Sequence, residues 1–138
     1  MFKLFTVTEA TRLLPEIERH VAVMQRASQE ATDLKERIAA LAQRPPAERR
    51  PVEVETRNLM REFDFVVHEA QEAKAELDRL GVELTDLKHG AVAFPASVRG
   101  EVVALTWARG QEAITHYRRL AGDAAPQLLP RHARLREA

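Results

Sequence analysis

The first third of the chain alternates apolar and polar residues in the rhythm of an amphipathic helix. Apolar positions three or four residues apart lie on one helix face. Thr6 and Glu9 form a capping-box pair at its start, and Phe5 stands just before them as part of a hydrophobic staple. Pro15 predicts either a kink near residues 11–15 or a helix that restarts there. The apolar positions are Leu13, Leu14, Ile17, Val21, Met24, Ala31, Leu34, Ile38 and Leu41.

A second stretch keeps this rhythm without a break over about four heptads, the length at which a coiled coil is indicated. Residues 43–51, which precede it, are rich in proline and arginine and must interrupt a helix. Gly81 is suited to cap the second helix in a left-handed conformation. Together these features predict an antiparallel helical hairpin over residues 6–80. The predicted seam positions are Val52, Thr56, Leu59, Phe63, Val66, Ala70, Ala73, Leu77 and Leu80.

After Gly81 the apolar period shortens to two, which is typical of strands. Residues 82–87 and 91–95 alternate around a turn at Gly90, and residues 101–107 form a β-branched run. We therefore expect a short antiparallel β meander over residues 82–107.

The last part of the chain is expected to return to helix. Ile114, Tyr117 and Leu120 stand three residues apart and predict a C-terminal helix over residues 110–121. Residues 123–138, with their prolines and basic side chains, are expected to form a loosely ordered tail. The expected fold is mainly α with a small β part, in a single domain over residues 1–122.

Composition narrows the classes of function. The 138 residues suit one domain, and 45% are apolar, so the chain is not disordered. The 21 basic and 21 acidic residues balance, which gives no global attraction to nucleic acid or anionic lipid. The chain has no cysteine and no apolar run of the length of a secretory signal or membrane span. We expect a cytoplasmic protein that does not bind membranes.

Candidate catalytic and metal-binding patterns are weak. Neither serine lies in a nucleophile elbow, and no glycine-rich phosphate loop or dinucleotide fingerprint is present. No catalytic residue, cofactor or metal is therefore expected. Pairs of histidine and carboxylate at helical spacing could offer metal ligands, although ordinary charge pairs on a solvated face explain them better. These pairs are Glu16 with His20, His68 with Glu72, and Glu112 with His116.

Arginines gather at the predicted hairpin tip and could contact the phosphates of a polyanion. The candidates are Arg44, Arg49, Arg50 and Arg57. Acidic residues lie among them, and the chain offers no aromatic platform for bases. A solvated charged surface is the simpler interpretation, and nucleic-acid association is the second hypothesis.

Three segments, in this order and spacing, resemble an uncharacterised bacterial family catalogued as domain of unknown function 2203. They are residues 5–15, residues 80–95 with their Gly90-Ala91-Val92-Ala93-Phe94-Pro95 run, and residues 105–114 with Trp107 and Gly110. The resemblance implies no activity. It places acidic residues after the glycine and a Trp-His pair one turn later, where this chain has Gln111, Glu112, Ala113, Tyr117 and Arg118. Because the chain departs from this pattern at several positions, we do not expect it to inherit a ligand or metal role from the family.

The favoured hypothesis is a non-enzymatic interaction or assembly module that self-associates through the hairpin. Two helices cannot bury both an unbroken seam and the apolar residues beside it, and exposed apolar stripes tend to be interfaces. We expect a homo-oligomer, with another protein as an alternative partner and a helix-borne metal or ligand site as the weakest hypothesis. The residues expected to carry self-association are Leu59, Phe63, Phe65, Val66 and Val67.

Overall fold

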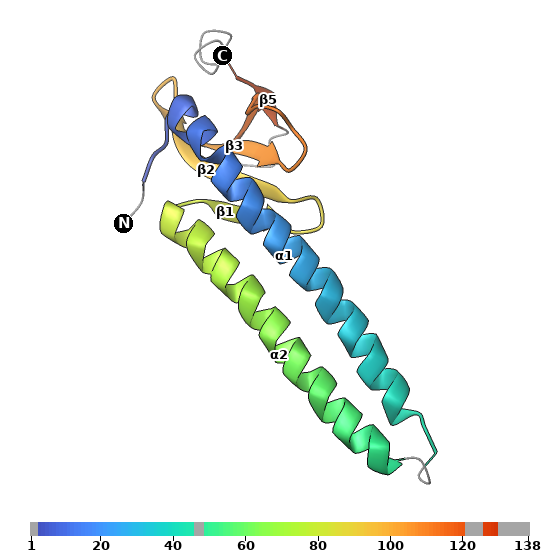
Figure 1. The fold of residues 1–138 in the computed structure, drawn as a ribbon. Helices are drawn as coiled ribbons and strands as arrows, with labels where there is room; N and C mark the ends of the chain where they lie inside the picture. Colours follow the sequence, from blue (N-terminus) through green and yellow to red (C-terminus); the bar gives the residue numbers. More distant parts are fainter. Residues whose placement is uncertain (1–2, 46–48, 121–125, 130–138) are drawn as a thin grey trace.

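The chain folds into two long helices followed by a five-stranded antiparallel sheet (Figure 1). The computed structural model describes residues 3–45, 49–120 and 126–129, apart from the side chains of residues 49–51. This architecture confirms the expected class, mainly α with a smaller β part. The elements are α1 (Val7–Ala42), α2 (Arg49–Leu80), β1 (Glu83–Asp86), β2 (Ala91–Val98), β3 (Glu101–Ala108), β4 (His116–Arg119) and β5 (Gln127–Leu128).

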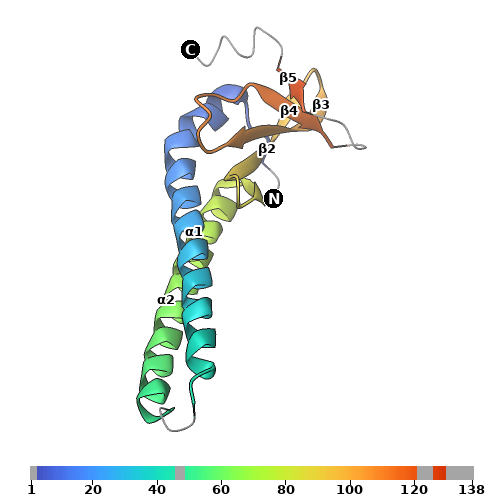
Figure 2. The same ribbon diagram turned by 90° about the vertical axis from the view of Figure 1, so that its right-hand side faces the viewer.

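The start of α1 is the predicted capping box. The Glu9 backbone N–H donates to the Thr6 hydroxyl at 3.0 Å, and the Thr6 N–H donates to the Glu9 carboxylate at 3.0 Å. The helix then runs without interruption through Pro15, so it does not restart there. Its first turns are bent relative to the rest (Figure 2), in keeping with the hydrogen bond that proline removes.

The two helices pack as the predicted antiparallel hairpin. Beyond the sheet, buried positions recur every seven residues on each helix, which is the spacing of a coiled-coil seam. Between these positions lie residues that are only partly buried, such as Ile38 and Phe63. The buried positions are Ala27, Leu34 and Leu41 on α1 and Val52, Leu59 and Val66 on α2.

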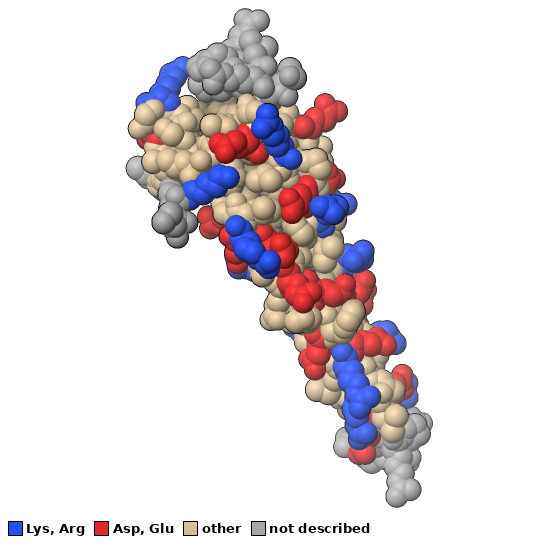
Figure 3. Space-filling view, turned by 60° about the vertical axis from the view of Figure 1, so that its left-hand side comes forward, with Lys and Arg blue, Asp and Glu red and all other residues tan. Residues whose placement is uncertain are grey.

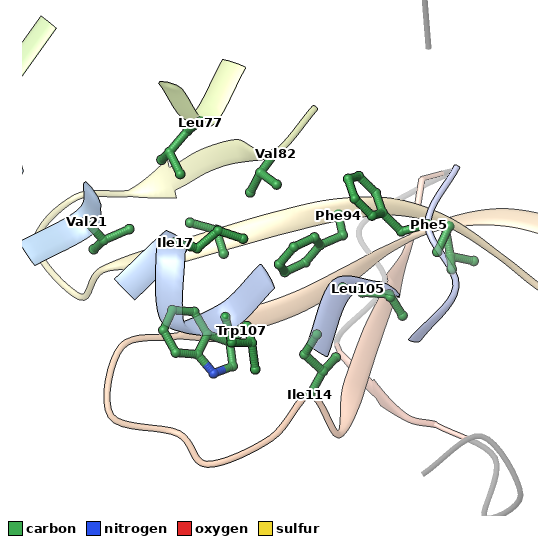
Figure 4. Close-up of a cluster of buried hydrophobic side chains, with 14 of the residues drawn as sticks. Phe5, Ile17, Val21, Leu77, Val82, Phe94, Leu105, Trp107 and Ile114 are labelled. Carbon is green, nitrogen blue, oxygen red and sulfur yellow. The ribbon is translucent and has the colours of Figure 1, made fainter. Parts of the chain in front are cut away.

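The larger core lies at the base of the hairpin, where the sheet packs against it (Figure 4). Ile17 and Val21 of α1 meet Leu77 of α2 and the inward side chains of the strands, among them Phe94 and Leu105. The segment before α1 joins this core because the Phe5 N–H donates to the Pro95 carbonyl at 2.7 Å. The Phe5 ring then packs edge-on against Phe94, with 5.4 Å between the ring centroids.

The strands follow one another in chain order, each antiparallel to the next. In β2 and β3 the inward residues, such as Phe94 and Leu105, are buried, and they alternate with small outward residues. The helices cover only one face of this sheet, and the sheet projects to one side of the hairpin (Figure 2).

The expected C-terminal helix over residues 110–121 is wrong. Gly110 adopts a φ of +104°, and the Trp107 indole N–H donates to the Gln111 carbonyl at 3.0 Å, which closes a turn. His116–Arg119 then pairs with β3 as β4. The spacing of Ile114 and Leu120 does not indicate a helix here because these residues share no buried face: Ile114 is fully buried and Leu120 is 63% exposed. Pairing with the free edge of β3 outweighs the weak helical pattern.

The sheet also extends into the expected loose tail. Most of residues 123–138 lie outside the described residues. Within the described part, however, Gln127–Leu128 forms β5, and the following Leu129 is buried with its N–H donating to the Thr115 carbonyl at 2.8 Å. The meander therefore has five strands rather than three.

Candidate interaction surface of the helical arm

The hairpin continues far beyond the sheet as a two-helix arm (Figures 1 and 2). We call this part, residues 27–42 of α1 and 49–70 of α2, the arm. Its own core is a separate cluster from the core at the base. A two-helix arm has only one seam, so any apolar residue beside that seam lies close to solvent.

One such line of residues runs along α1. Ile17, Met24, Ala31 and Ile38 are spaced by seven and therefore share one helix face. Ile17 and Met24 are buried in the core that the sheet completes. Ala31 and Ile38, which continue the same line into the arm, are only partly buried. The sheet thus covers the first half of this line, and no described element covers the second half.

The facing line on α2 behaves in the same way. Leu77 is fully buried beneath the sheet, whereas Ala70 and Phe63, seven and fourteen residues earlier, are only partly buried. Beside them Val67 is partly buried and Met60 is 53% exposed. We call the uncovered residues the open stripe: Ala31, Ile38, Thr56, Met60, Phe63, Val67 and Ala70.

The five residues predicted for self-association do not form one surface. Leu59 and Val66 are buried between the helices. Phe63 and Val67 belong to the open stripe, on one side of the arm. Phe65 is 65% exposed and lies two residues from Val67, which is about 200° around the helix. Phe65 instead lines a groove on the other side of the arm, with Leu34 and Val66 as its floor and charged side chains around it.

Met60 is the stripe residue that the sequence analysis missed. It lies seven residues before Val67, so the same heptad spacing that marked the seam could have identified it. The sequence pattern placed Phe65 and Val67 beside the seam but did not connect Val67 with Met60. Two such residues one heptad apart indicate a second apolar line.

The tip arginines are only partly described. Arg44 forms an ion pair with Glu55, with 3.8 Å between the charged atoms, and Arg57 is exposed. The side chains of Arg49 and Arg50 lie outside the described residues. On the face of the arm in Figure 3, basic and acidic side chains are interspersed. This face does not form the continuous basic surface that attracts the phosphate backbone of a nucleic acid.

The His–carboxylate pairs remain separate pairs. His20 lies 3.7 Å from Glu16, and His68 lies 3.0 Å from Glu72. The third pair loses its helical spacing, because Glu112 lies in the turn and His116 in β4. Within the described parts of the chain, no group of three or more histidine or carboxylate side chains is arranged to hold a metal ion.

A polar clamp holds the β1–β2 turn against α1, and the sequence did not reveal it. The Gln25 amide donates to the Leu87 carbonyl at 3.0 Å, and its oxygen accepts from the Arg109 guanidinium at 3.0 Å. The Arg109 backbone N–H donates to the Gly90 carbonyl at 3.1 Å. These two contacts join residues that are 62 and 84 positions apart in the sequence, and no local pattern signals contacts at such a distance. The clamp fixes the sheet on the side of the hairpin where the open stripe begins.

Comparison with known proteins identifies a family but no activity. No curated protein and no solved structure matches the chain. Among the residues that the structure describes, no helix is both long enough and apolar enough to cross a membrane. The sequence profile described as uncharacterized conserved protein (DUF2203) matches residues 3–125, and the chain therefore belongs to that family.

Proposed function

We propose that the protein is a non-enzymatic assembly module that self-associates through the open stripe of its arm. One observation carries this proposal. The apolar lines that the sheet buries at the base, through Met24 on α1 and Leu77 on α2, continue along the arm with no described element over them. A second copy of the chain presents the same stripe and can bury both surfaces together.

The stripe has the chemistry of an interface core. A Met, Phe or Val side chain contributes about 1.5–3 kcal/mol when it passes from full exposure to full burial. Phe63 and Val67 have already gained part of this burial free energy within the hairpin, and Met60 has gained about half of it. The remaining gain favours association and is opposed by the loss of rigid-body freedom. Self-association of moderate strength is the expected result.

The proposed assembly works in the cytoplasm without a cofactor. The chain has no cysteine, which suits a reducing compartment.

Sedimentation equilibrium over a range of micromolar concentrations tests the proposal. The unaltered chain should sediment as a dimer or a larger oligomer, and Met60→Glu should shift it toward monomer. Met60 is half exposed, so the substitution places a charge in the interface without disturbing the hairpin core. Circular dichroism should show unchanged helix content in this variant.

Phe65→Glu is the matched control. Phe65 is more exposed than Met60 and lies on the same helix, but it faces the other side of the arm. It should leave the oligomer intact. Dissociation by Phe65→Glu but not by Met60→Glu would move the interface to the Phe65 groove, and a monomeric unaltered chain would refute self-association.

A further inference from the structure

We infer that two copies of the chain pair with their arms antiparallel, about a two-fold axis that passes beside Phe63. This inference rests on the proposed self-association through the open stripe. It adds the orientation of the partner and the residues that meet. Three features of the chain carry it: the position of the sheet, a heptad line on α2, and the level of Lys35.

The sheet excludes the parallel arrangement. It packs on Ile17 and Met24, which begin the line that Ala31 and Ile38 continue, so it projects on the same side of the hairpin as the open stripe (Figure 2). If two stripes met with parallel arms, both sheets would lie at the same end of the interface and hold the arms apart. With antiparallel arms, the two sheets lie at opposite ends of the pair and do not meet each other.

The heptad line on α2 that includes Met60 is complementary to the same line of a second copy only when the two lines run in opposite directions. Glu53, Met60, Val67 and Lys74 are spaced by seven, so they lie along one edge of the open stripe. The line carries an acid at one end, a base at the other and apolar residues between. In an antiparallel pair Glu53 faces Lys74 of the second copy, and Met60 faces its Val67. With parallel arms the α2 line would instead face α1 of the second copy, and Met60 would lie opposite Ile38.

The centre of this line coincides with the centre of the stripe on α1. Met60 and Val67 are centred next to Phe63, and Ala31 and Ile38 are centred next to Lys35. The Lys35 ammonium lies 5.6 Å from the centroid of the Phe63 ring, so the two centres are at the same level of the arm. One two-fold axis must relate both helices of the arm to the second copy, so the two centres have to lie at the same level, as they do here.

Lys35 would stand near the axis in this arrangement, where an unpaired charge opposes association. Its ammonium already lies over the Phe63 ring, and this cation–π contact offsets part of that cost. Lys74 forms an ion pair with Asp78 at 3.2 Å in the single chain. Both partners of that pair are 60% exposed, so the pair is weak and Lys74 can turn to the second copy's Glu53.

Disulfide trapping tests the orientation cleanly because the chain has no cysteine of its own. Met60→Cys and Val67→Cys are made as separate chains carrying tags of different mass, then mixed and mildly oxidised. The mixture should yield the mixed disulfide. Each variant alone should yield little, because its two copies lie about 10 Å apart along the arm, beyond disulfide reach.

Three outcomes would overturn the inference. They are efficient self-linking of Met60→Cys, linking of Met60→Cys to Ile38→Cys as parallel arms require, and no linking in a preparation that sediments as a dimer. A preparation that sediments only as monomer would instead overturn the proposed function. The two failures are therefore distinguishable.

Charge exchange gives an independent readout. Glu53→Lys should weaken dimerisation roughly tenfold, since it turns two attractions into two repulsions. Lys74→Glu should do the same. The double variant Glu53→Lys/Lys74→Glu should recover most of the affinity. Failure of the double variant to recover, with helix content unchanged, would contradict the antiparallel pairing.

Discussion

At the scale of single residues, Gly90 shows how closely the sheet is fitted to α1. Its φ is +66°, and a Cβ added there would lie 2.9 Å from the Arg109 Cβ and 3.1 Å from a Val21 methyl. Gly90→Ala should therefore lower the free energy of unfolding by about 2–3 kcal/mol, combining strain at positive φ with overpacking. Gly100→Ala is the control: its φ is +79°, but a Cβ there meets nothing within 4 Å. Equal losses in chemical denaturation would show that the close packing around Gly90 does not contribute to stability.

The capping box makes a pH-dependent contribution at the same scale. The Thr6 backbone N–H donates to the Glu9 carboxylate and lowers the pKa of Glu9 below its ordinary value of 4.5. The folded state thus favours ionised Glu9, so its contribution is present above pH 4.5 and is lost as the pH falls through the lowered pKa. Glu9→Gln should destabilise the protein near pH 6, and the difference should shrink toward pH 3 in thermal unfolding. A difference independent of pH would rule out this linkage.

At the scale of the helices, burial ranks the seam positions differently from the sequence pattern. Heptad spacing makes Leu59 and Phe63 equivalent seam residues, but Leu59 is 4% exposed and Phe63 is only partly buried. Leu59→Ala should cost about 2–4 kcal/mol, and Phe63→Ala should cost less despite the larger side chain. Urea denaturation at a concentration where the chain is monomeric would measure both. A larger loss for Phe63→Ala would mean that the stripe is covered within a single chain.

At the scale of the whole molecule, charge balance predicts weak binding of polyanions. Arg44 is paired with Glu55, and acidic side chains lie among the basic ones along the arm (Figure 3). Few counterions are then released on contact with phosphates, so any affinity for duplex DNA or single-stranded RNA should be weak and lost by physiological salt. Fluorescence anisotropy at low and physiological salt measures this. Tight, salt-resistant binding that disappears when Arg44, Arg49 and Arg50 become glutamines would instead favour the tip as a nucleic-acid contact.

Local sequence patterns predicted the elements whose contacts lie close along the chain. The capping box at Thr6 and Glu9, the two heptad patterns and the proline-rich turn predicted the hairpin, because helix periodicity and caps depend on neighbours within one or two turns. The β1 and β2 strands followed from alternation around the turn at Gly90, and β3 followed from the β-branched run at residues 101–107, although β2 continues to Val98 beyond its predicted end at residue 95. These features survive in the folded chain because tertiary packing acts in the same direction as local preference.

Only the tertiary structure decided which segments pair as strands and which apolar lines are buried. His116–Arg119 became a strand because β3 offered a free edge, although its spacing favours a helix. Phe65 and Val67 appear as one apolar pair in the sequence, yet they lie on opposite sides of the arm. The line through Met24 and Ala31 is uniform in sequence, and the sheet divides it into a buried half and an open half. Heptad spacing specifies which residues share a face, whereas the long-range fit of the sheet determines how far along that face burial extends.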